Sequence, residues 1–383
     1  MGYDFVILGG TGIQGRIAAR DLLENGHSVL LCGRNKARVA HLLKKFKRTG
    51  FAEADLRDIG HTAKVIRKSG AKTVLNCAEG DWNLNALKAC AHAGVNSLDL
   101  GSEILMTKQQ LAMHRTLQKK GIIHITGCGS VPGVGNVMLR YAAEKLDTLH
   151  TIEVGFAWNS NIKKFVVPFS MQSIIEEFTD PALNVENGRF TRTMPMKSIK
   201  FSHDDFVGEQ ERFFVRHPET YTFYSYYKNK GLKNVRFYAE FPPHSFNVIS
   251  MLIELGLGSK EPITVDGVKV RPVDVVTEVL KNIPMPPHYR ETEDLWVDIA
   301  GMRGKLKKTI KMRCIVPTLP GWEDAGCNID TGMTVSVMAQ MVHNGSISER
   351  GSFAPEGVVP PGPFFRELRK RQMIVLENGK VIN

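Results

Sequence analysis

The stretch ILGGTGIQG, residues 7–15, has glycines at a spacing that suits phosphate binding. Gly10, Gly12 and Gly15 match the pattern G-x-G-x-x-G, and from Gly9 the stretch also reads G-x-x-G-x-x-G. Glycines permit a tight turn whose backbone N–H groups approach a pyrophosphate at the positive end of the next helix. The residues expected to bind a dinucleotide here are Gly9, Gly10, Thr11, Gly12, Ile13 and Gly15.

The flanking residues supply the elements that such a turn needs. An apolar strand, Asp4–Leu8, leads into the glycines, and apolar residues at three- and four-residue steps predict a helix over Ile13–Leu23. A second strand is expected at Ser28–Cys32. The succession of strand, glycine turn, helix and strand is the context that makes a short glycine motif specific for dinucleotide binding.

The end of the second strand indicates which dinucleotide binds. NAD enzymes usually carry Asp or Glu there, about 20 residues after the glycines, to bind the ribose 2′-hydroxyl. This chain has Gly33, Arg34 and Asn35 and no acid at that point. Because a guanidinium pairs with a 2′-phosphate in forked geometry, Arg34, followed by Asn35, predicts NADP(H) rather than NAD. Lys36 and Arg38 fit the opening of a solvated helix.

Strand and helix patterns keep alternating as far as residue 126, with strands expected at Phe51–Asp55, Thr73–Cys77, Ser97–Glu103 and Ile122–Thr126. Repeated strand–helix units imply an α/β fold with a parallel, doubly wound Rossmann sheet. Ligands bind such sheets beyond the carboxyl ends of the strands. We therefore expect Asp55 beside the adenine, and the ribose and nicotinamide beside Asn76, Cys77 and Ala78.

Three further side chains with useful chemistry follow strands of this sheet. Asp99 and Glu103 come after the fifth strand, and Cys128 after the sixth. This position makes them candidate catalytic residues. Each also has a structural alternative: Asp99 as a helix cap, Glu103 as a solvent-facing acid, and Cys128 as a small residue beneath the nicotinamide.

A second motif, YAAEK at Tyr141–Lys145, matches the Tyr-x-x-x-Lys of short-chain dehydrogenases. On a helix this spacing puts both side chains on one face, where Lys lowers the pKa of Tyr. The helix is expected to begin near Pro132, which leaves Tyr141 more than two turns inside it. A packing role is favoured, and a carbonyl reductase using Tyr141 and Lys145 is the alternative.

The composition is that of a globular protein, with 383 residues, 43% of them hydrophobic and 23% charged. The longest apolar run, from Phe246, contains Glu254 and is too short to cross a bilayer. The N-terminus lacks signal-peptide features, and six cysteines without a CxxC pair favour the cytoplasm and no metal site. The net charge of +11 is spread along the chain, which favours anionic small molecules over nucleic acid.

Beyond Leu146 the pattern changes to longer strands, expected at Thr151–Trp158, Val235–Phe241, Leu295–Gly301 and Lys307–Val316. Helices are expected between them, for example at Met171–Thr179, Pro272–Leu280 and Thr334–Val342. Long antiparallel strands with helices on one face are expected here, as is typical of an α+β domain. We expect this second domain to bind the substrate and to form a homodimer.

Seven short stretches along the chain resemble the saccharopine dehydrogenase family, in its saccharopine reductase-like branch. They are the glycine turn, NCAEG, SLDLGSE, GCGSVPGVGN, HPETYTF, DTGMTVSVMAQM and FAPEGVVPPGPFFRELRKR. The resemblance implies a C-terminal segment that returns to the nucleotide domain. The expected division is then 1–135 for the Rossmann domain, 136–349 for the substrate domain, and 350–383 for the returning segment.

The resemblance also implies NADP-dependent hydride transfer at the C–N bond of an amino-acid-derived imine or secondary amine, with a small anionic substrate. The family's acid falls on Asp99 and its cysteine on Cys128, while Ser130 and Val131 replace the acid expected before Pro132. Arg216 is assigned to a substrate carboxylate. A carboxylate such as Asp99 or Glu103 suits a positive imine nitrogen. An NADPH-binding sensor without turnover is a further alternative.

Overall fold

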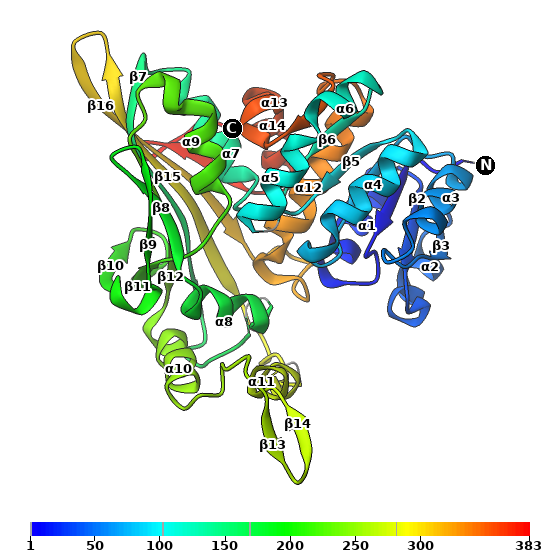
Figure 1. Cartoon of the computed structure of the whole chain (residues 1–383), viewed down its shortest axis with the longest axis horizontal. Coiled ribbons are helices and arrows are strands. Elements are labelled where there is room, and N and C mark those ends of the chain that lie inside the picture. Colours follow the sequence, from blue (N-terminus) through cyan, green and yellow to red (C-terminus); the bar gives the residue numbers. More distant parts are fainter. Residues whose placement is uncertain (1, 102, 168–169, 281) are drawn as a thin grey trace.

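Two β-sheets stand side by side, with helices packed between them (Figure 1). The computed structural model describes residues 2–101, 103–167, 170–280 and 282–383. Residues from both sheets contribute to one continuous apolar core. Because of this shared core, the carboxyl edge of the first sheet is held next to one face of the second.

The first sheet is parallel and seven-stranded, with the order β17-β6-β5-β4-β1-β2-β3. Its apolar strands β1, β2 and β4 are buried throughout, as expected for a parallel sheet covered on both faces. The strands are β1 (Phe5–Leu8), β2 (Val29–Gly33), β3 (Thr49–Glu53), β4 (Thr73–Asn76), β5 (Asn96–Asp99), β6 (Ile123–Ile125) and β17 (Gly351–Phe353). This confirms the predicted Rossmann-like sheet.

Helices cover both faces of this sheet: α1 (Ile13–Glu24), α2 (Ala40–Lys45), α3 (Ile59–Ser69), α4 (Asn83–Ala93), α5 (Ile104–Ala112), α6 (His114–Lys119) and α12 (Ile329–His343). Side chains of α3 and α4 pack with Val6 and Val74 on one face. Side chains of α1 and α12 pack with Ile7 and Leu75 on the other. Gly70 and Gly94 end α3 and α4 in the left-handed conformation that glycine adopts without strain.

The second sheet is mixed, with the path β10-β11-β12-β7-β15-β16-β18-β19, while β8 pairs with β12 and β9. Only the β12–β7 pair on this path is parallel. The strands are β7 (Thr148–Ser160), β8 (Ala182–Glu186), β9 (Arg189–Thr193), β10 (Lys200–Asp204), β11 (Gly208–Phe214), β12 (Asn234–Phe241), β15 (Glu291–Arg303), β16 (Leu306–Pro317), β18 (Ile374–Glu377) and β19 (Lys380–Val381).

Side chains alternate across this sheet, so that Val154, Phe237 and Val297 face the core while polar residues occupy the opposite face. The remaining helices are α7 (Val134–Ala143), α8 (Met171–Thr179), α9 (Glu219–Tyr227), α10 (Pro243–Glu254), α11 (Pro272–Leu280), α13 (Pro355–Val358) and α14 (Pro361–Lys370). A hairpin of β13 (Ile263–Val265) and β14 (Val268–Val270) lies apart from both sheets (Figure 1). The α+β character predicted for the second domain is confirmed.

The C-terminal part of the chain joins both sheets. β17 pairs with β6 in the first sheet, whereas β18 pairs with β16 in the second. The return to the first sheet begins before residue 350, because α12 already packs along α1. The division of the chain at residues 135 and 349 stays a prediction.

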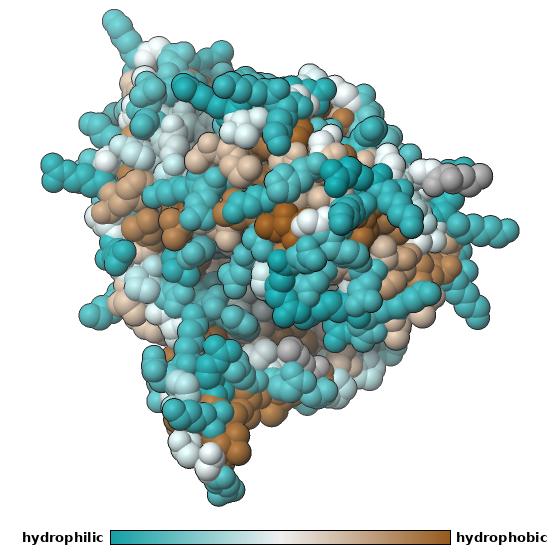
Figure 2. All heavy atoms as spheres, turned by 45° about the vertical axis from the view of Figure 1, so that its right-hand side comes forward, coloured by the Kyte–Doolittle hydropathy of each residue, from teal (hydrophilic) through white to brown (hydrophobic). Residues whose placement is uncertain are grey.

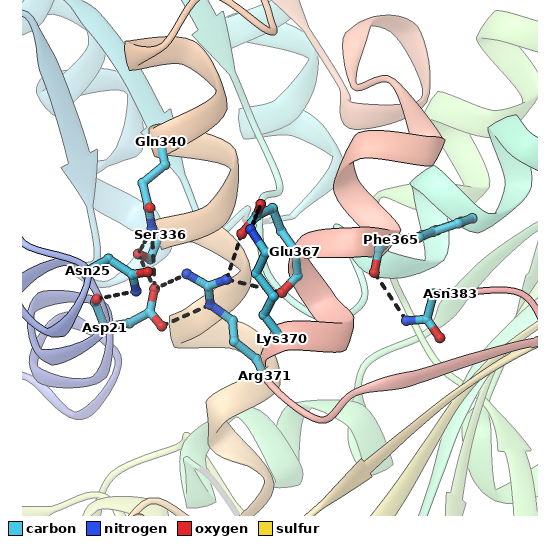
Figure 3. Close-up of polar contacts among 9 residues, drawn as sticks. All are labelled: Asp21, Asn25, Ser336, Gln340, Phe365, Glu367, Lys370, Arg371 and Asn383. Atoms are coloured by element: carbon cyan, nitrogen blue, oxygen red, sulfur yellow. Dashed lines mark hydrogen bonds and ion pairs between the residues drawn. The ribbon is translucent and has the colours of Figure 1, made fainter.

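A buried ion pair ties this C-terminal part to the first helix (Figure 3). Arg371 donates from Nε to one oxygen of Asp21 and from Nη2 to the other, both at 2.8 Å. The Ser336 hydroxyl of α12 donates to Asp21 at 2.6 Å, and the Glu367 side chain accepts from Arg371 at 3.2 Å. α1, α12 and the end of α14 are thus joined by one network.

Candidate cofactor and substrate site

The glycine turn after β1 packs directly against the end of β4. Gly9 has a φ of +69°, and a Cβ there would lie 2.5 Å from the backbone nitrogen of Ala78. A Cβ on Gly15 would collide with the carbonyl oxygen of Gly9. Glycine is therefore required at both positions, by backbone conformation at Gly9 and by close packing at Gly15.

The start of α1 is open toward this turn. Gly12 precedes the helix and supplies no side-chain cap. The first backbone N–H groups of α1 therefore remain available to donate to another acceptor. Ile13 is 57% exposed although it is large and apolar. An uncapped helix start beside a glycine turn fits the pyrophosphate of a dinucleotide.

The end of β2 lies against the same turn. A Cβ on Gly33 would be 2.7 Å from the Thr11 hydroxyl oxygen, so the Thr11 side chain packs directly on the Gly33 backbone. Arg34 comes next and is exposed, while the Asn35 side chain accepts from the Ala37 N–H at 3.0 Å. The guanidinium of Arg34 is thus free in this conformation to meet a phosphate beyond β2.

Asp55 and Asn76 already have protein partners. Hydrogen bonds from Arg57 lower the pKa of Asp55 to about 2, and Arg34 is near enough to contribute. Asn76 donates to the Asn83 side chain at 2.8 Å and accepts from the Ala78 N–H at 3.3 Å. Their predicted contacts with adenine and ribose, like those of the half-buried Cys77 and of Ala78, stay predictions.

Asp99 is buried at the end of β5 and is 2% exposed. One oxygen accepts from the N–H groups of Gly101 at 2.8 Å and Gly127 at 3.1 Å, and from the Thr126 hydroxyl at 3.0 Å. The other accepts from the Gln110 amide at 2.6 Å. With both oxygens bonded, Asp99 holds the loops after β5 and β6 together, and this geometry favours a positioning role over the predicted catalytic one.

Cys128 is also buried. Its thiol donates to the Ile125 carbonyl at 3.4 Å, and its N–H donates to the Asp99 carbonyl at 2.7 Å. Burial raises the pKa of Cys128 well above its usual range, which disfavours the reactive thiolate. The small-residue alternative suits Cys128 better than a chemical role.

Glu103 and Arg216 are brought together across the two sheets. Glu103 precedes α5, Arg216 follows β11, and their charged groups are 3.6 Å apart. Arg216 also donates to Asp180 at 2.9 Å, and Lys260 lies 3.7 Å from the same carboxylate. Asp180 was missed from sequence because no motif marks it. Ser102, inside the SLDLGSE stretch, lies outside the described residues.

The start of α12 reaches the glycine turn and the loop after β6. Asn328 accepts from the Gln14 amide of α1 at 3.0 Å, and Thr331 donates to the Ser130 hydroxyl at 3.2 Å. A Cβ on Gly332 would collide with the Ile17 side chain. The stretch DTG is therefore the point at which α12 docks onto α1.

This geometry agrees with two family models. The saccharopine dehydrogenase NADP-binding domain matches residues 5–125, and the saccharopine dehydrogenase C-terminal domain matches residues 121–374. The chain belongs to the saccharopine dehydrogenase family. The resemblance noted from sequence is confirmed, and NADP(H) is the cofactor of the matched domain.

Two relatives found by sequence comparison have names that refer to carboxylated amines. A carboxyaminopropylagmatine dehydrogenase of Synechocystis sp. is 24% identical and covers 95% of this chain and 94% of its own. A carboxynorspermidine synthase of Vibrio cholerae is 23% identical over 61% of this chain and 59% of its own. The apo saccharopine dehydrogenase (L-Glu forming) of Saccharomyces cerevisiae superposes with a TM-score of 0.78 at 13% identity, covering both chains fully. This last likeness supports the fold.

The Tyr141 and Lys145 pair is used inside the saccharopine dehydrogenase fold for packing. Lys145 donates to the Tyr141 hydroxyl at 2.9 Å and pairs with Glu377 of β18 at 2.5 Å. The Tyr141 ring packs edge-on against Phe365 of α14. These contacts join α7, α14 and β18, so the structure favours the packing interpretation over the carbonyl reductase. Across the described ranges, no helix is long and apolar enough to cross a membrane.

Proposed function

We propose that this protein is an NADP-dependent oxidoreductase that transfers hydride to or from the C–N bond of an imine or secondary amine derived from an amino acid. One observation carries the proposal: an uncapped helix start and a glycine turn lie beside a strand end that carries Arg34 and no acid. The family match over both domains supports it. The exposed guanidinium would bind the 2′-phosphate, and the α1 amides would bind the pyrophosphate.

The bound cofactor supplies the hydride, so the protein's share is to bind, orient and exclude water. The Asp99 network fixes the loops after β5 and β6, which border the nicotinamide end of a Rossmann site. The core face of the second sheet closes the other side. A shielded position between the sheets would keep the reacting carbon and nitrogen aligned.

The substrate class follows from the relatives and from the charges between the sheets. The names of both relatives describe an amine that carries a carboxy group. We propose the same class here, with Arg216 as the residue for the carboxylate. Glu103 and Asp180 now pair with Arg216, and a substrate carboxylate would take the place of the more distant Glu103. No specific amine is assigned.

Calorimetric titration with NADPH and NADH tests the cofactor assignment. Wild type is expected to bind NADPH at least tenfold more tightly than NADH, because a forked charge-assisted contact is worth about 1.5–3 kcal/mol. Arg34→Ala should lose this preference and keep its NADH affinity. Arg38→Ala, which removes an exposed arginine of the same segment, is the matched control. A preference for NADH, or an unchanged Arg34→Ala, would refute the assignment.

A turnover screen separates the enzyme from a binding protein. NADPH consumption would be followed with amines paired with α-keto acids or semialdehydes. Tight NADPH binding with no turnover for any pair would favour the sensor alternative. We also propose the cytoplasm as the location, since all six cysteines are free thiols.

We further propose that the protein is a homodimer through its projecting module, defined as α10, β13, β14 and α11. Apolar side chains of this module face solvent and gather at the lower end of the molecule (Figure 2). On α10 these are Met251 and Leu255, and on α11 Val275 and Val279, each pair one turn apart. A twofold contact between copies would cover this patch.

Sedimentation analysis tests the dimer. Wild type should sediment as a dimer, and the double variant Met251→Lys with Val279→Lys as a monomer, because buried lysines oppose association. Leu306→Lys, at the exposed tip of the β15–β16 hairpin, is the control and should stay dimeric. A monomeric wild type would rule the dimer out.

A further inference from the structure

A pair of carboxyl groups, Glu293 and Asp330, meets between the two sheets. Glu293 comes from β15 in the second sheet, and Asp330 from the first turn of α12. The two side chains lie close enough for each to shift the pKa of the other. Asp330 is only 3% exposed, whereas Glu293 is partly exposed, so the pair is buried but reachable from one side. Neither residue was singled out from the sequence.

The carboxyl pair has no cationic partner in the described part of the chain. No Lys or Arg there forms an ion pair with either carboxylate. The titratable groups that act on the pair are the acids Glu291 and Asp294 and the buried thiols Cys314 and Cys327. Glu291 is itself satisfied by Tyr289 and by the Cys327 N–H. Two adjacent acids without a cation form a strong site for a positive charge.

The surroundings of the pair place it at the proposed active site. The Ser130 hydroxyl, in the loop after β6, accepts from Thr331 at 3.2 Å and is near enough to Asp330 to lower the pKa of that carboxyl. The first turn of α1 is also near, because Gln14 bonds to Asn328 just ahead of α12. The Oε1 atom of Gln14 is buried without a partner. The pair therefore lies at the carboxyl edge of the first sheet, where a Rossmann fold binds its ligands.

A second observation points to a ligand on the same wall. Trp158 of β7 is directly opposite Glu293 in the β7–β15 ladder, so both side chains project from one face of the sheet. Trp158 is 4% exposed, and its indole N–H is buried without an acceptor. Nε2 of the neighbouring His244 is unpartnered too. Buried polar groups left unpaired are costly, and an acceptor atom of a bound molecule would relieve that cost at the indole N–H.

We propose that Glu293 and Asp330 bind the cationic amine nitrogen of the substrate, so that the site accepts alkyl amines and rejects anions of the same length. This proposal rests on the oxidoreductase function proposed above and assigns its amine side, as Arg216 would serve the carboxylate side. In hydride transfer to an iminium, the C=N electron pair moves onto nitrogen, and the resulting amine must take up a proton. Water supplies that proton, and the ionised carboxyl pair stabilises the ammonium product.

The protonation of the pair makes the proposal testable. Burial, and then the Asp330 carboxylate, raise the pKa of Glu293 well above its usual range, and burial raises the pKa of Asp330 to about 6. The raised pKa of Glu293 favours a proton that is shared by the empty pair and held mainly by Glu293. A cation that arrives beside it favours the fully ionised pair, so binding should release part of a proton. Below about pH 6 both carboxyls become neutral, and amine affinity should fall.

The experiment is calorimetric titration of the full-length protein, loaded with NADP+, with butane-1,4-diamine as the probe and succinate as the anionic control. Wild type should bind the diamine but not succinate, release protons in buffers of different ionisation enthalpy, and weaken below pH 6. Glu293→Gln and Asp330→Asn should each lower diamine affinity more than tenfold, and Glu293→Gln should abolish proton release. Asp324→Asn, an exposed acid shortly before α12, is the matched control.

The outcomes separate the two proposals. No diamine binding by wild type, binding of succinate instead, or variants within tenfold of wild type would overturn the amine site. NADP+ affinity and the thermal midpoint, measured for each variant, identify a variant that has lost its fold. If a variant does not fold, proton release on diamine binding to wild type tests the amine site instead. Loss of all NADPH turnover with intact diamine binding would overturn the oxidoreductase while leaving the amine site in place.

Discussion

A tyrosine and a lysine four residues apart on a helix are not enough for reductase chemistry. In this molecule Lys145 shares Glu377 with the Tyr141 hydroxyl, which donates to that carboxylate at 3.2 Å. The Lys145 charge is thus partly neutralised by Glu377, and the tyrosine is packed against Phe365. These neighbours belong to the C-terminal helix and strand, so the contacts serve to attach β18 to α7.

Replacing Tyr141 by Phe tests this conclusion. The change removes a hydroxyl with two partners and should cost about 1 kcal/mol in the free energy of unfolding. NADPH turnover should stay within twofold of wild type. Tyr224→Phe, which removes a hydroxyl bonded to the Gly188 carbonyl, is the matched control. A drop in turnover of a hundredfold or more would instead support the alternative function, a carbonyl reductase that uses Tyr141 and Lys145.

Residue-level prediction from sequence worked where a residue's role depends on its immediate neighbours in the chain. The glycine turn, with Gly9 and Gly15 at their required positions, is such a case. Asp99 was placed at the right strand end, but its partners Gln110 and Thr126 come from other elements, so its bonded state was not foreseeable. Glu293 and Asp330 were missed for the same reason, since they meet only when the second sheet and α12 pack together.

At the scale of elements, the position of α1 depends on the C-terminal part of the chain. Its uncapped N-terminal end forms part of the proposed phosphate site. Near its other end, Asp21 forms an ion pair with Arg371. α12 lies alongside and adds Ser336 to the same carboxylate (Figure 3). Sequence patterns predicted each of these helices, but their mutual packing depends on contacts between distant segments.

Breaking the Asp21–Arg371 pair should therefore be costly. Arg371→Ala leaves a buried carboxylate without its cation and should lower the free energy of unfolding by about 3–5 kcal/mol, measured by urea denaturation. The double variant Asp21→Asn with Arg371→Met should recover part of that loss, because no charge stays buried. Arg369→Ala, on the exposed side of α14, is the control. A loss below 1 kcal/mol for Arg371→Ala would show that the pair is dispensable.

At the scale of the whole molecule, the Rossmann sheet and a second, α+β domain were both predicted, whereas the parallel β12–β7 pair and the interlocking of the two sheets were not. The composition and the alternation of patterns identify two kinds of sheet, because these depend on local hydrophobic periodicity. The return of the chain through α12 and β17 to the first sheet, and through β18 to the second, is a matter of long-range pairing. Only the family resemblance suggested it.

The placement of β17 has a consequence for biosynthesis. Until Gly351–Phe353 leaves the ribosome, β6 remains an unprotected edge, and α1 lacks the cover of α12. At roughly 5–20 residues per second, the nascent chain spends on the order of ten seconds or more in that state. A growing polypeptide of this kind should depend on chaperones, and a message that terminates early should yield an insoluble fragment instead of a free-standing nucleotide-binding unit.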